Sequence, residues 1–482
     1  MSEHDQSSLY YLCKHIDETI KAGQLNRSLK LIHDCVVQIV SEPICTALVF
    51  GSANLDKLCQ KVGRHCLEQH ISDKEIHKQA TFDYVYLVSR LQKSGGHTRV
   101  IRNFISARPE ARHLIISTEL AGTSDKDFLY TTLPDTIKLD IHYAPKGNYL
   151  AKLIWLQHHL LQLNMQKVYL FNHHQDAVII AAVQPQIDLK CSFYHHVDHQ
   201  FCLGSTINYD EHIDINPLIY QRCRLAGIDN MYIPLTAKDK GTREESKLFR
   251  ASGFLTTCTV ARFNKVEKPY FISYIDVITQ LLTETQGIHI HIGTLTPWAI
   301  WRLKYCLRKN KISRERFIYI PWVADVWKTV QDLNVDLYIS SFPYGAGLTL
   351  IEIMGAGVPV AIHRNVFSNF LSELHLAYSD VFSWQFTDEL IQYCHSVTAK
   401  ELTEHGLTGR QHYETYYNDN ELASVLDERK IIIPSTVPET EQTLDTSEYA
   451  YWLSRQFSFK HYMLKYAYSV GKKINNLKAF FK

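Results

Sequence analysis

The chain lacks long apolar runs and a marked excess of either charge. Across its 482 residues, 51 lysines and arginines balance 50 aspartates and glutamates. This balance argues against a nucleic-acid-binding protein, which needs a basic excess to neutralise phosphates. No apolar stretch approaches the ~20 residues of a membrane-spanning helix. The composition, with 45% hydrophobic and 21% charged residues, predicts a soluble globular protein, and the length predicts two or three domains.

The sequence also lacks the signs of export. Its 11 cysteines are scattered and form no CxxC pair, which predicts reduced thiols rather than a disulfide framework. Residues 1–6 lack the basic and apolar regions of a secretion signal. We therefore expect a cytoplasmic protein. The 25 histidines are too many for all to be catalytic, and we expect most to be structural or exposed.

The pattern of apolar residues changes along the chain. Residues 1–78 carry apolar residues at helical spacing, which predicts a helical N-terminal region. After it, short apolar runs alternate with helical patterns, which predicts parallel βα units in an α/β protein. We expect two Rossmann-like domains, at 79–237 and 250–430, joined by a charged linker. The predicted strands are 84–88, 113–117, 167–171, 191–194, 231–234, 256–261, 288–292, 317–320, 335–339 and 358–362.

The most informative stretch follows the predicted strand 335–339. A loop containing Gly345 and Gly347 opens an apolar helix. Such a loop leaves backbone N–H groups pointing outward, which suits a phosphate or diphosphate. Glu352 is a lone carboxylate on this apolar segment, where a charge is costly unless a polar group such as a ribose diol meets it. The alternative is an ordinary strand–loop–helix turn whose glycines allow tight packing.

This stretch resembles the donor-binding signature of nucleotide-sugar glycosyltransferases of the GT-B fold. Around Phe342-Pro343-Tyr344-Gly345 it is similar to the F-P-x-G-G-G-x-T form of the O-linked N-acetylglucosamine transferases and bacterial adhesin N-glucosyltransferases. The large retaining branch carries E-x7-E instead. Here Tyr344 stands eight residues before Glu352, so the first glutamate of that motif is absent. The resemblance implies two Rossmann-like domains facing a cleft, with residues 1–78 as a helical extension.

The resemblance implies a donor site in the second domain. Arg262 and Lys268 match the family's basic loop and would stabilise the charge that builds on the leaving diphosphate. Lys265 between them is a further candidate, and a solvated turn is the alternative. Trp322 either stacks on uracil or belongs to the core. The backbone or side chains that would hold the rest of the donor are Gly345, Gly347, Leu348, Thr349 and Glu352.

The first domain should hold the acceptor and the catalytic base. After the strand 84–88, Gly95 and Gly96 form a turn where substrate can approach the backbone. His97 follows, and an imidazole with a pKa of ~6.5 suits proton removal from an acceptor. The resembling inverting enzymes place a histidine in the equivalent loop. A capping or surface role is the alternative for His97.

Two further strand ends, at 172–176 and 194–200, carry histidines and aspartates. Their spacings match no standard zinc motif, and the resemblance implies a transferase that works without a bound metal. We therefore expect no metal and no other cofactor. His196 and Asp198 are alternative catalytic residues, and which histidine acts stays open. The residues predicted to line the acceptor pocket are Gly95, Gly96, His174, His195 and His199.

Residues 431–482 should form a crossing helix and a basic, aromatic tail. From residue 449 the tail carries seven basic residues and no acidic one, a pattern typical of a helix on an anionic membrane. In GT-B enzymes a C-terminal helix commonly crosses back to the first domain, which is the alternative. Both can hold together, with the early part crossing and the end touching lipid.

The resemblance implies an enzyme that moves a hexose from a UDP-sugar to a glycan, lipid-linked glycan or protein, as in bacterial glycan biosynthesis. It leaves inversion or retention of the sugar configuration open. One alternative is a catalytically silent GT-B partner that binds the acceptor for another transferase. Another is a nucleotide-sugar epimerase of the same two-domain architecture. The sequence determines neither the sugar, nor the acceptor, nor the oligomeric state.

Overall fold

The computed structural model describes residues 8–428 and residue 433, apart from short gaps. The gaps lie at 43–44, 71–77, 79, 94–95, 197–198, 245 and 269. Gly95, Asp198 and, apart from residue 433, the predicted C-terminal tail 431–482 therefore lie outside the described residues. Among the described residues, none of the helices combines the length and the apolarity that a membrane-spanning segment requires.

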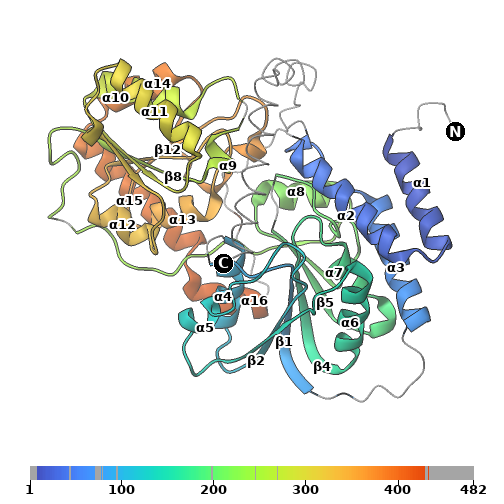
Figure 1. The fold of residues 1–482 in the computed structure, drawn as a ribbon. Helices are drawn as coiled ribbons and strands as arrows, with labels where there is room; N and C mark the ends of the chain where they lie inside the picture. Colours follow the sequence, from blue (N-terminus) through green and yellow to red (C-terminus); the bar gives the residue numbers. More distant parts are fainter. Residues whose placement is uncertain are drawn as a thin grey trace, which may run out of the picture.

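The N-terminal domain is built on a parallel sheet of seven strands (Figure 1). The strands are β1 (Ala80–Val88), β2 (Arg112–Ser117), β3 (Lys138–Tyr143), β4 (Leu163–Phe171), β5 (Cys191–His195), β6 (Glu211–Asp214) and β7 (Met231–Tyr232). Their order in the sheet is β3-β2-β1-β4-β5-β6-β7. In β1, Val85 and Leu87 point into one hydrophobic core, and Tyr86 and Val88 point into another on the opposite face. Because both faces are covered, the strands are nearly continuous apolar runs.

Helices cover both faces of this sheet. The core that includes Val85 is formed with α1 (Ser8–Lys21), α2 (Leu25–Ser41), α3 (Ala53–His70), α6 (Tyr149–Leu161) and α7 (Ala177–Ala182). The opposite face packs against α4 (Gly96–Ser106) and α5 (Phe128–Thr132), while α8 (Pro217–Leu225) follows β6. The three N-terminal helices therefore share one continuous core with the sheet. They are an extension of this domain rather than a separate unit.

Gly63 is the point where α3 approaches α7 most closely. A Cβ atom at this position would lie 1.8 Å from the backbone oxygen of Ala181, far inside van der Waals contact. The Gly63 carbonyl also accepts a hydrogen bond from Gln157 of α6 at 2.9 Å. The glycine therefore sets the distance at which the helical extension docks.

Substitution of Gly63 by alanine should lower the free energy of unfolding by about 1–3 kcal/mol, the usual cost of overpacking a core. Alanine is the better helix former by about 1 kcal/mol, but the clash involves backbone atoms and cannot be relieved by a side-chain rotation. Urea unfolding measures the difference, with Arg64→Ala at the neighbouring exposed position as control. Unchanged or increased stability of Gly63→Ala would contradict close docking.

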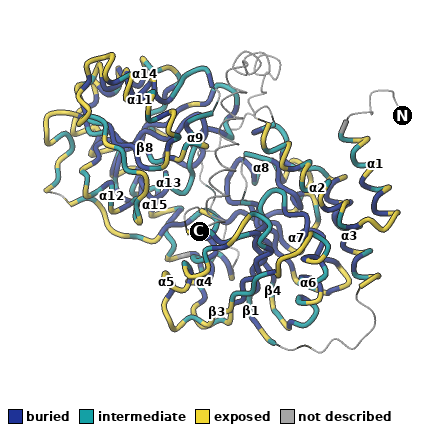
Figure 2. The backbone as a smooth tube through the Cα atoms, viewed as in Figure 1, coloured by how far each residue is buried: buried dark blue, intermediate teal, exposed yellow. Residues whose placement is uncertain are grey.

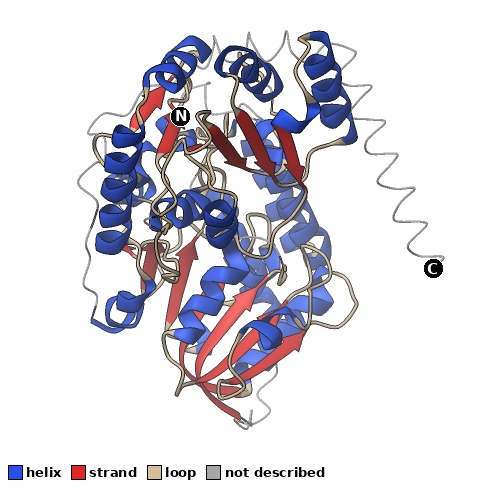
Figure 3. Ribbon diagram, turned by 90° about the vertical axis from the view of Figure 1, so that its left-hand side faces the viewer, coloured by secondary structure: helices blue, strands red, loops and turns tan. Residues whose placement is uncertain are grey.

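The C-terminal domain is built on a second parallel sheet, of six strands in the order β10-β9-β8-β11-β12-β13. The strands are β8 (Thr256–Val260), β9 (Ile288–Ile292), β10 (Phe317–Ile320), β11 (Leu337–Ile339), β12 (Val360–His363) and β13 (Phe382–Trp384). The helices are α9 (Phe263–Val266), α10 (Tyr274–Thr285), α11 (Pro297–Lys309), α12 (Val326–Asp332), α13 (Gly347–Gly355), α14 (Thr387–Ser396) and α15 (Ala399–Tyr416). Figure 2 shows the strands of both sheets largely buried, and Figure 3 shows helices on both faces of each sheet.

After α15 the chain returns to the N-terminal domain. The last described helix, α16 (Leu422–Glu428), packs Leu422 and Leu426 into the core beside α4 (Figure 1). Arg108, at the end of α4, donates two hydrogen bonds to Asp427 at 2.6 and 3.1 Å. This return ties the two domains together at a second point besides the segment between β7 and β8.

The predicted fold class is confirmed: two parallel α/β domains with a helical N-terminal extension. Each of the ten predicted strands overlaps an observed one, but three strands were not predicted, namely β3, β6 and β13. β3 is an edge strand and β6 reads Glu-His-Ile-Asp, so neither forms an apolar run. β13 has only three residues, too few to show a pattern.

Candidate functional site

The carboxyl ends of the two sheets face each other, and residues beyond the strand ends touch across the domain boundary. Asn216, just after β6, contacts His375 of the C-terminal domain, with 2.6 Å between Nδ2 and Nε2. The rings of His199 and Tyr344 lie 5.9 Å apart between centroids. A Cβ atom at Gly96, at the start of α4, would lie 3.8 Å from the Leu348 side chain in the first turn of α13. Both predicted glycine loops therefore line one cleft.

The Gly345 loop is held tightly at the start of α13. The Gly345 carbonyl accepts a hydrogen bond from the Lys265 ammonium. A Cβ atom at Gly345 would lie 2.2 Å from Cγ of Glu373, a buried residue that accepts a hydrogen bond from the Ser340 hydroxyl. The loop therefore requires glycine at position 345 because a buried side chain fills the space beside it.

Three cations follow β8, and two of them contact this loop. Lys268 places its ammonium 5.7 Å from the centroid of the Tyr344 ring, and Lys265 donates to the loop as described. Arg262 is the N-cap residue of α9 and is exposed. The cavity beside the loop is small, about 40 Å³. Its lining includes His199, Lys265, Tyr344, Gly345, Gly347, Glu373 and His375.

Glu352 has a polar partner, and that partner belongs to the other domain. One terminal nitrogen of Arg99, on α4, lies 2.9 Å from both carboxylate oxygens of Glu352 on α13. The Glu352 side chain is 6% exposed and that of Arg99 is 27% exposed. The need for a partner was predicted, but Arg99 was not, because nothing local in the sequence links residues that are 253 positions apart.

Trp322 lies at the surface of the cleft and not in the core. Its side chain is 54% exposed, and the Lys93 ammonium of the N-terminal domain lies 5.5 Å from its ring centroid. The core alternative for this tryptophan is therefore excluded. An aromatic face that already attracts a cation across the cleft is available for stacking.

Four histidines gather on the N-terminal side of the cleft. The ring of His97 lies 4.5 Å from that of His196 and 5.1 Å from that of His173, centroid to centroid. The His174 ring lies 6.1 Å from His196. Although His97 is partly exposed as a residue, both its ring nitrogens are buried and meet no hydrogen-bond partner among the described residues.

Burial controls the protonation of this cluster. It lowers the pKa of His97 and His196 well below the usual histidine value, and it lowers the pKa of His174 to about 3. Neighbouring histidines act in the same direction because like charges repel. The rings are therefore neutral at pH ~7 and, in this closed arrangement, they are weak bases.

The remaining predicted residues are placed as follows. His199 faces Tyr344 across the cleft, Thr349 lies in the first turn of α13, and His195 is buried in the N-terminal domain at 1% exposure. His195 therefore points away from the predicted acceptor pocket, since neighbouring side chains on a strand face opposite sides. Asp198 and Gly95 lie outside the described residues.

Asp176 belongs to a strand end that was predicted to line the sugar or acceptor pocket, but it is buried and holds the strand ends together beneath the histidines. One oxygen of Asp176 accepts hydrogen bonds from Ser89 after β1 and Thr118 after β2, at 2.6 and 2.7 Å. The other oxygen caps α7 through the amides of Val178 and Ile179. The capping role has a local signal, since Asp176 directly precedes an apolar helix. The contacts with Ser89 and Thr118 have none, because they join segments far apart in the chain.

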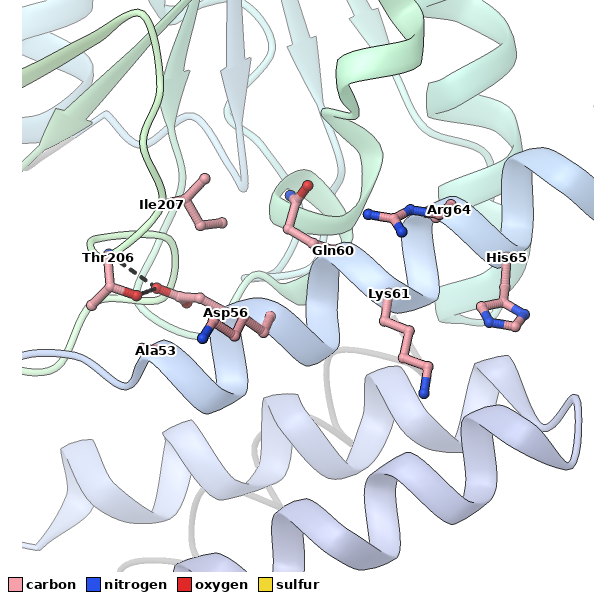
Figure 4. A pocket seen from close by; sticks show the side chains of 9 residues that line it. Ala53, Asp56, Gln60, Lys61, Arg64, His65, Thr206 and Ile207 are labelled. Carbon is pink, nitrogen blue, oxygen red and sulfur yellow. Dashed lines mark hydrogen bonds between the residues drawn. The ribbon is translucent and has the colours of Figure 1, made fainter.

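A larger cavity, of about 500 Å³, lies away from the cleft, between α3 and residues 206–207 (Figure 4). Lys57, Lys61 and Arg64 line it together with Asp56. Both Asp56 oxygens are occupied, by the Gly204 amide and by Thr206, and burial raises the pKa of this carboxyl to about 6. The cavity also contains His65, but it lies on α3, away from the glycine loops that meet between the domains, so we place the candidate site in the cleft.

Comparison with known proteins supports the fold. No protein-family model and no curated protein matches the chain. The Anabaena protein Alr3699/HepE in complex with UDP is similar in structure, with a TM-score of 0.55 and 12% identity over 72% of this chain and 99% of that chain. The lipopolysaccharide outer core galactosyltransferase WaaB gives a TM-score of 0.53 and 16% identity, over 72% and 98%. Sucrose-phosphate synthase from Thermosynechococcus elongatus gives 0.51 and 12%, over 72% and 98%.

At these identities the likeness concerns the fold. In this chain the fold consists of two parallel sheets with a cleft between their carboxyl ends. The chain therefore has the GT-B fold of nucleotide-sugar glycosyltransferases.

Proposed function

We propose that the protein is a glycosyltransferase that moves a hexose from a UDP-sugar to a glycan, lipid-linked glycan or protein acceptor. The observation that carries the proposal is the Gly345 loop at the start of α13, held by Lys265 and facing the Gly96 turn across the cleft. The similar HepE structures contain UDP, UDP and glucose, or UDP-glucose. A nucleotide diphosphate at the start of α13 would meet backbone N–H groups and the positive end of the helix.

Each donor-side residue has a role in this proposal. Lys268 and Arg262 would balance the charge that develops on UDP as the glycosidic bond breaks. Trp322 would stack on uracil from the exposed side of the cleft. Glu352 would accept hydrogen bonds from the ribose after it releases Arg99. The cavity beside the Gly345 loop, of about 40 Å³, is far smaller than the ~300 Å³ of a typical ligand pocket. A diphosphate that fills it would need the domains to part, whereas Trp322 and Arg262 are already exposed.

The acceptor side would use the histidine cluster. Parting of the domains would expose His97 and His196 to water and raise their pKa values toward the ordinary range, where imidazole is an effective base. If the reaction is retaining instead, the leaving phosphate assists the acceptor and no such base is needed. We propose no metal in the transfer step. Peripheral membrane contact through residues 449–482 and a cytoplasmic location remain predictions.

One observation favours a second candidate function, a catalytically silent partner that binds an acceptor for another transferase. Glu352 is already satisfied by Arg99, so the closed state is stable without a nucleotide. A donor must displace Arg99 before Glu352 can reach a ribose. The two candidates differ in whether the cleft takes up UDP and releases it from UDP-sugars.

Thermal unfolding with UDP, GDP, ADP or CMP tests the donor site. We expect a UDP-selective stabilisation of about 2.7 kcal/mol at a hundredfold excess over Kd. Glu352→Ala should remove this stabilisation because it deletes the ribose contact. Glu404→Ala, on the exposed face of α15, is the matched control and should keep it.

The outcomes separate the candidates. A UDP shift that is lost in Glu352→Ala, together with UDP release from UDP-sugars in the presence of acceptors, supports the transferase. The same shift with no UDP release favours the silent partner. Interconversion of UDP-hexoses without an acceptor would indicate an epimerase. Absence of a shift with any nucleotide would contradict the donor site itself.

A further inference from the structure

Four side chains of the kinds that bind transition metals meet in the interior of the N-terminal domain. His195 ends β5, His212 and Asp214 lie on β6, and Cys223 lies on α8. Their exposed fractions are 1%, 2%, 0% and 6% respectively. The nearest ligand atoms of all four lie within 4.8 Å of one another. None of the four belongs to the proposed donor site.

Four of the six distances between ligand atoms are close to those of a tetrahedral site, and the other two lie within 4.8 Å. Asp214 Oδ1 lies 2.9 Å from His195 Nδ1 and 3.2 Å from His212 Nε2. Cys223 Sγ lies 3.7 Å from His195 Nδ1 and 3.6 Å from Asp214 Oδ1. Bonds of ~2.0 Å to nitrogen or oxygen and ~2.3 Å to sulfur imply tetrahedral edges of about 3.3 Å between nitrogen and oxygen, and about 3.5 Å to sulfur. The four observed edges agree with these values to within a few tenths of an ångström.

The surroundings orient the carboxylate for such a role. Asn230 donates a hydrogen bond to the other Asp214 oxygen, Oδ2, at 2.5 Å. This contact leaves Oδ1 to face both imidazoles and the thiol. In metal sites, residues that do not bind the ion typically hydrogen-bond to its ligands and orient them, as Asn230 does here for Asp214.

The charge balance also favours a divalent cation. A buried carboxylate costs several kcal/mol unless it is compensated, and Asp214, which is fully buried, is compensated by hydrogen bonds to His195, His212 and Asn230. With two neutral imidazoles, the carboxylate and a thiolate together carry two negative charges, which one M²⁺ neutralises.

We propose that His195, His212, Asp214 and Cys223 bind one zinc ion as a structural site. Mixed imidazole, thiolate and carboxylate ligands suit this borderline-soft cation. Four protein ligands and complete burial leave no open position for a substrate, which distinguishes the site from a catalytic zinc. Zinc binding releases the thiol proton of Cys223 to solvent and involves no oxidation or reduction.

The site would brace the N-terminal wall of the cleft. His195 directly precedes His196 of the histidine cluster, and Asp214 lies two residues before Asn216, which contacts His375 of the other domain. Zinc would thus fix the ends of β5 and β6 to α8, and with them the residues that line the cleft. The expectation of no metal rested on transfer chemistry and on spacings that match no standard motif, and it did not consider His212 or Cys223.

Metal analysis of the full chain, purified without a histidine tag from zinc-containing medium, tests the proposal. We expect about one zinc per chain by mass spectrometry after dialysis. Cys223→Ser and His212→Asn should each reduce zinc content at least tenfold under the same conditions. Cys191→Ser is the matched control, since Cys191 is buried at the opposite end of β5 and should leave the zinc content unchanged.

A second measurement does not depend on the folding of the variants. The wild-type chain reconstituted with Co²⁺ should show a thiolate-to-metal absorption band in the near ultraviolet, and chelation of zinc should lower its Tm. The site is supported if the wild type contains about one zinc per chain, if both Cys223→Ser and His212→Asn lose it, and if Cys191→Ser keeps it. Less than a tenth of an equivalent in the wild type with no Co²⁺ band, or zinc that persists in both variants, would overturn it.

Discussion

Mild acid should unfold this protein near pH ~5, in a steep transition. Burial lowers the pKa of His174 and His363 to about 3 and that of His291 to about 4. In the unfolded chain a histidine titrates near ~6.5. The stability that depends on these histidines being neutral is therefore fully present above pH ~6.5. It is lost as the pH falls toward the pKa values of the folded state. Each such group removes about 1.4 kcal/mol of stability per pH unit in this window.

His291 and His363 lie in the C-terminal domain and together remove about 3 kcal/mol per pH unit, against a total stability of roughly 5–15 kcal/mol for a typical domain. His174 removes about 1.4 kcal/mol per pH unit in the N-terminal domain. Burial also lowers the pKa of His97, His196 and His289, which adds to the loss. Asp56 acts in the opposite direction. Burial raises its pKa to about 6, whereas an aspartate in the unfolded chain titrates near ~4. Between these two pH values only the folded state binds this proton, so Asp56 adds stability as the pH falls.

Circular dichroism and tryptophan fluorescence between pH 7 and 4 would follow the transition. His363→Gln should make the pH dependence of the unfolding free energy shallower by about 1.4 kcal/mol per pH unit, because one proton uptake is removed. His70→Gln, at the exposed end of α3, is the control and should keep the wild-type slope. If circular dichroism and fluorescence stay unchanged down to pH ~4, the prediction is wrong, because protonation of the buried histidines would then not lower the free energy of unfolding.

Loss of Lys268 should slow sugar transfer about 10²–10³-fold, the usual effect of removing one group that stabilises developing negative charge. The change is Lys268→Met, which keeps most of the side-chain length but removes the ammonium that lies over the Tyr344 ring. Because the charge on UDP grows only as the glycosidic bond breaks, we expect kcat to fall more than KM rises. Release of UDP from UDP-sugars, with and without acceptor, gives the rates.

Lys304→Met, at an exposed position of α11, is the matched control and should leave the rate unchanged. Arg262→Ala tests the second cation of the same loop. If Arg262→Ala slows the reaction as strongly as Lys268→Met, both cations stabilise the diphosphate. A normal rate in Lys268→Met would remove this lysine from the proposed leaving-group site.

Ten of the strands were predictable because they are short apolar runs bounded by polar residues, and such a run is a local property of the sequence. The start of α13 was predictable for the same reason, since glycines and the following apolar residues mark it within ten positions. β6 was missed because its four residues are mostly charged or polar. Its polar residues are buried because they have partners elsewhere in the fold: Glu211 pairs with Ser192 and Lys167, and Asp214 pairs with His195 and Cys223. No periodicity reveals this.

The sequence by itself determined the two sheets, the glycine loop and the kinds of side chain that end each strand, because these depend on neighbours within a few residues. Only the tertiary structure decided which strand ends meet. It paired Arg99 with Glu352 across the cleft, gathered His97 with His173 and His196, and turned His195 inward toward Asp214. These contacts depend on the order of strands in each sheet and on the docking of the two domains, which are fixed by packing between segments far apart in the chain.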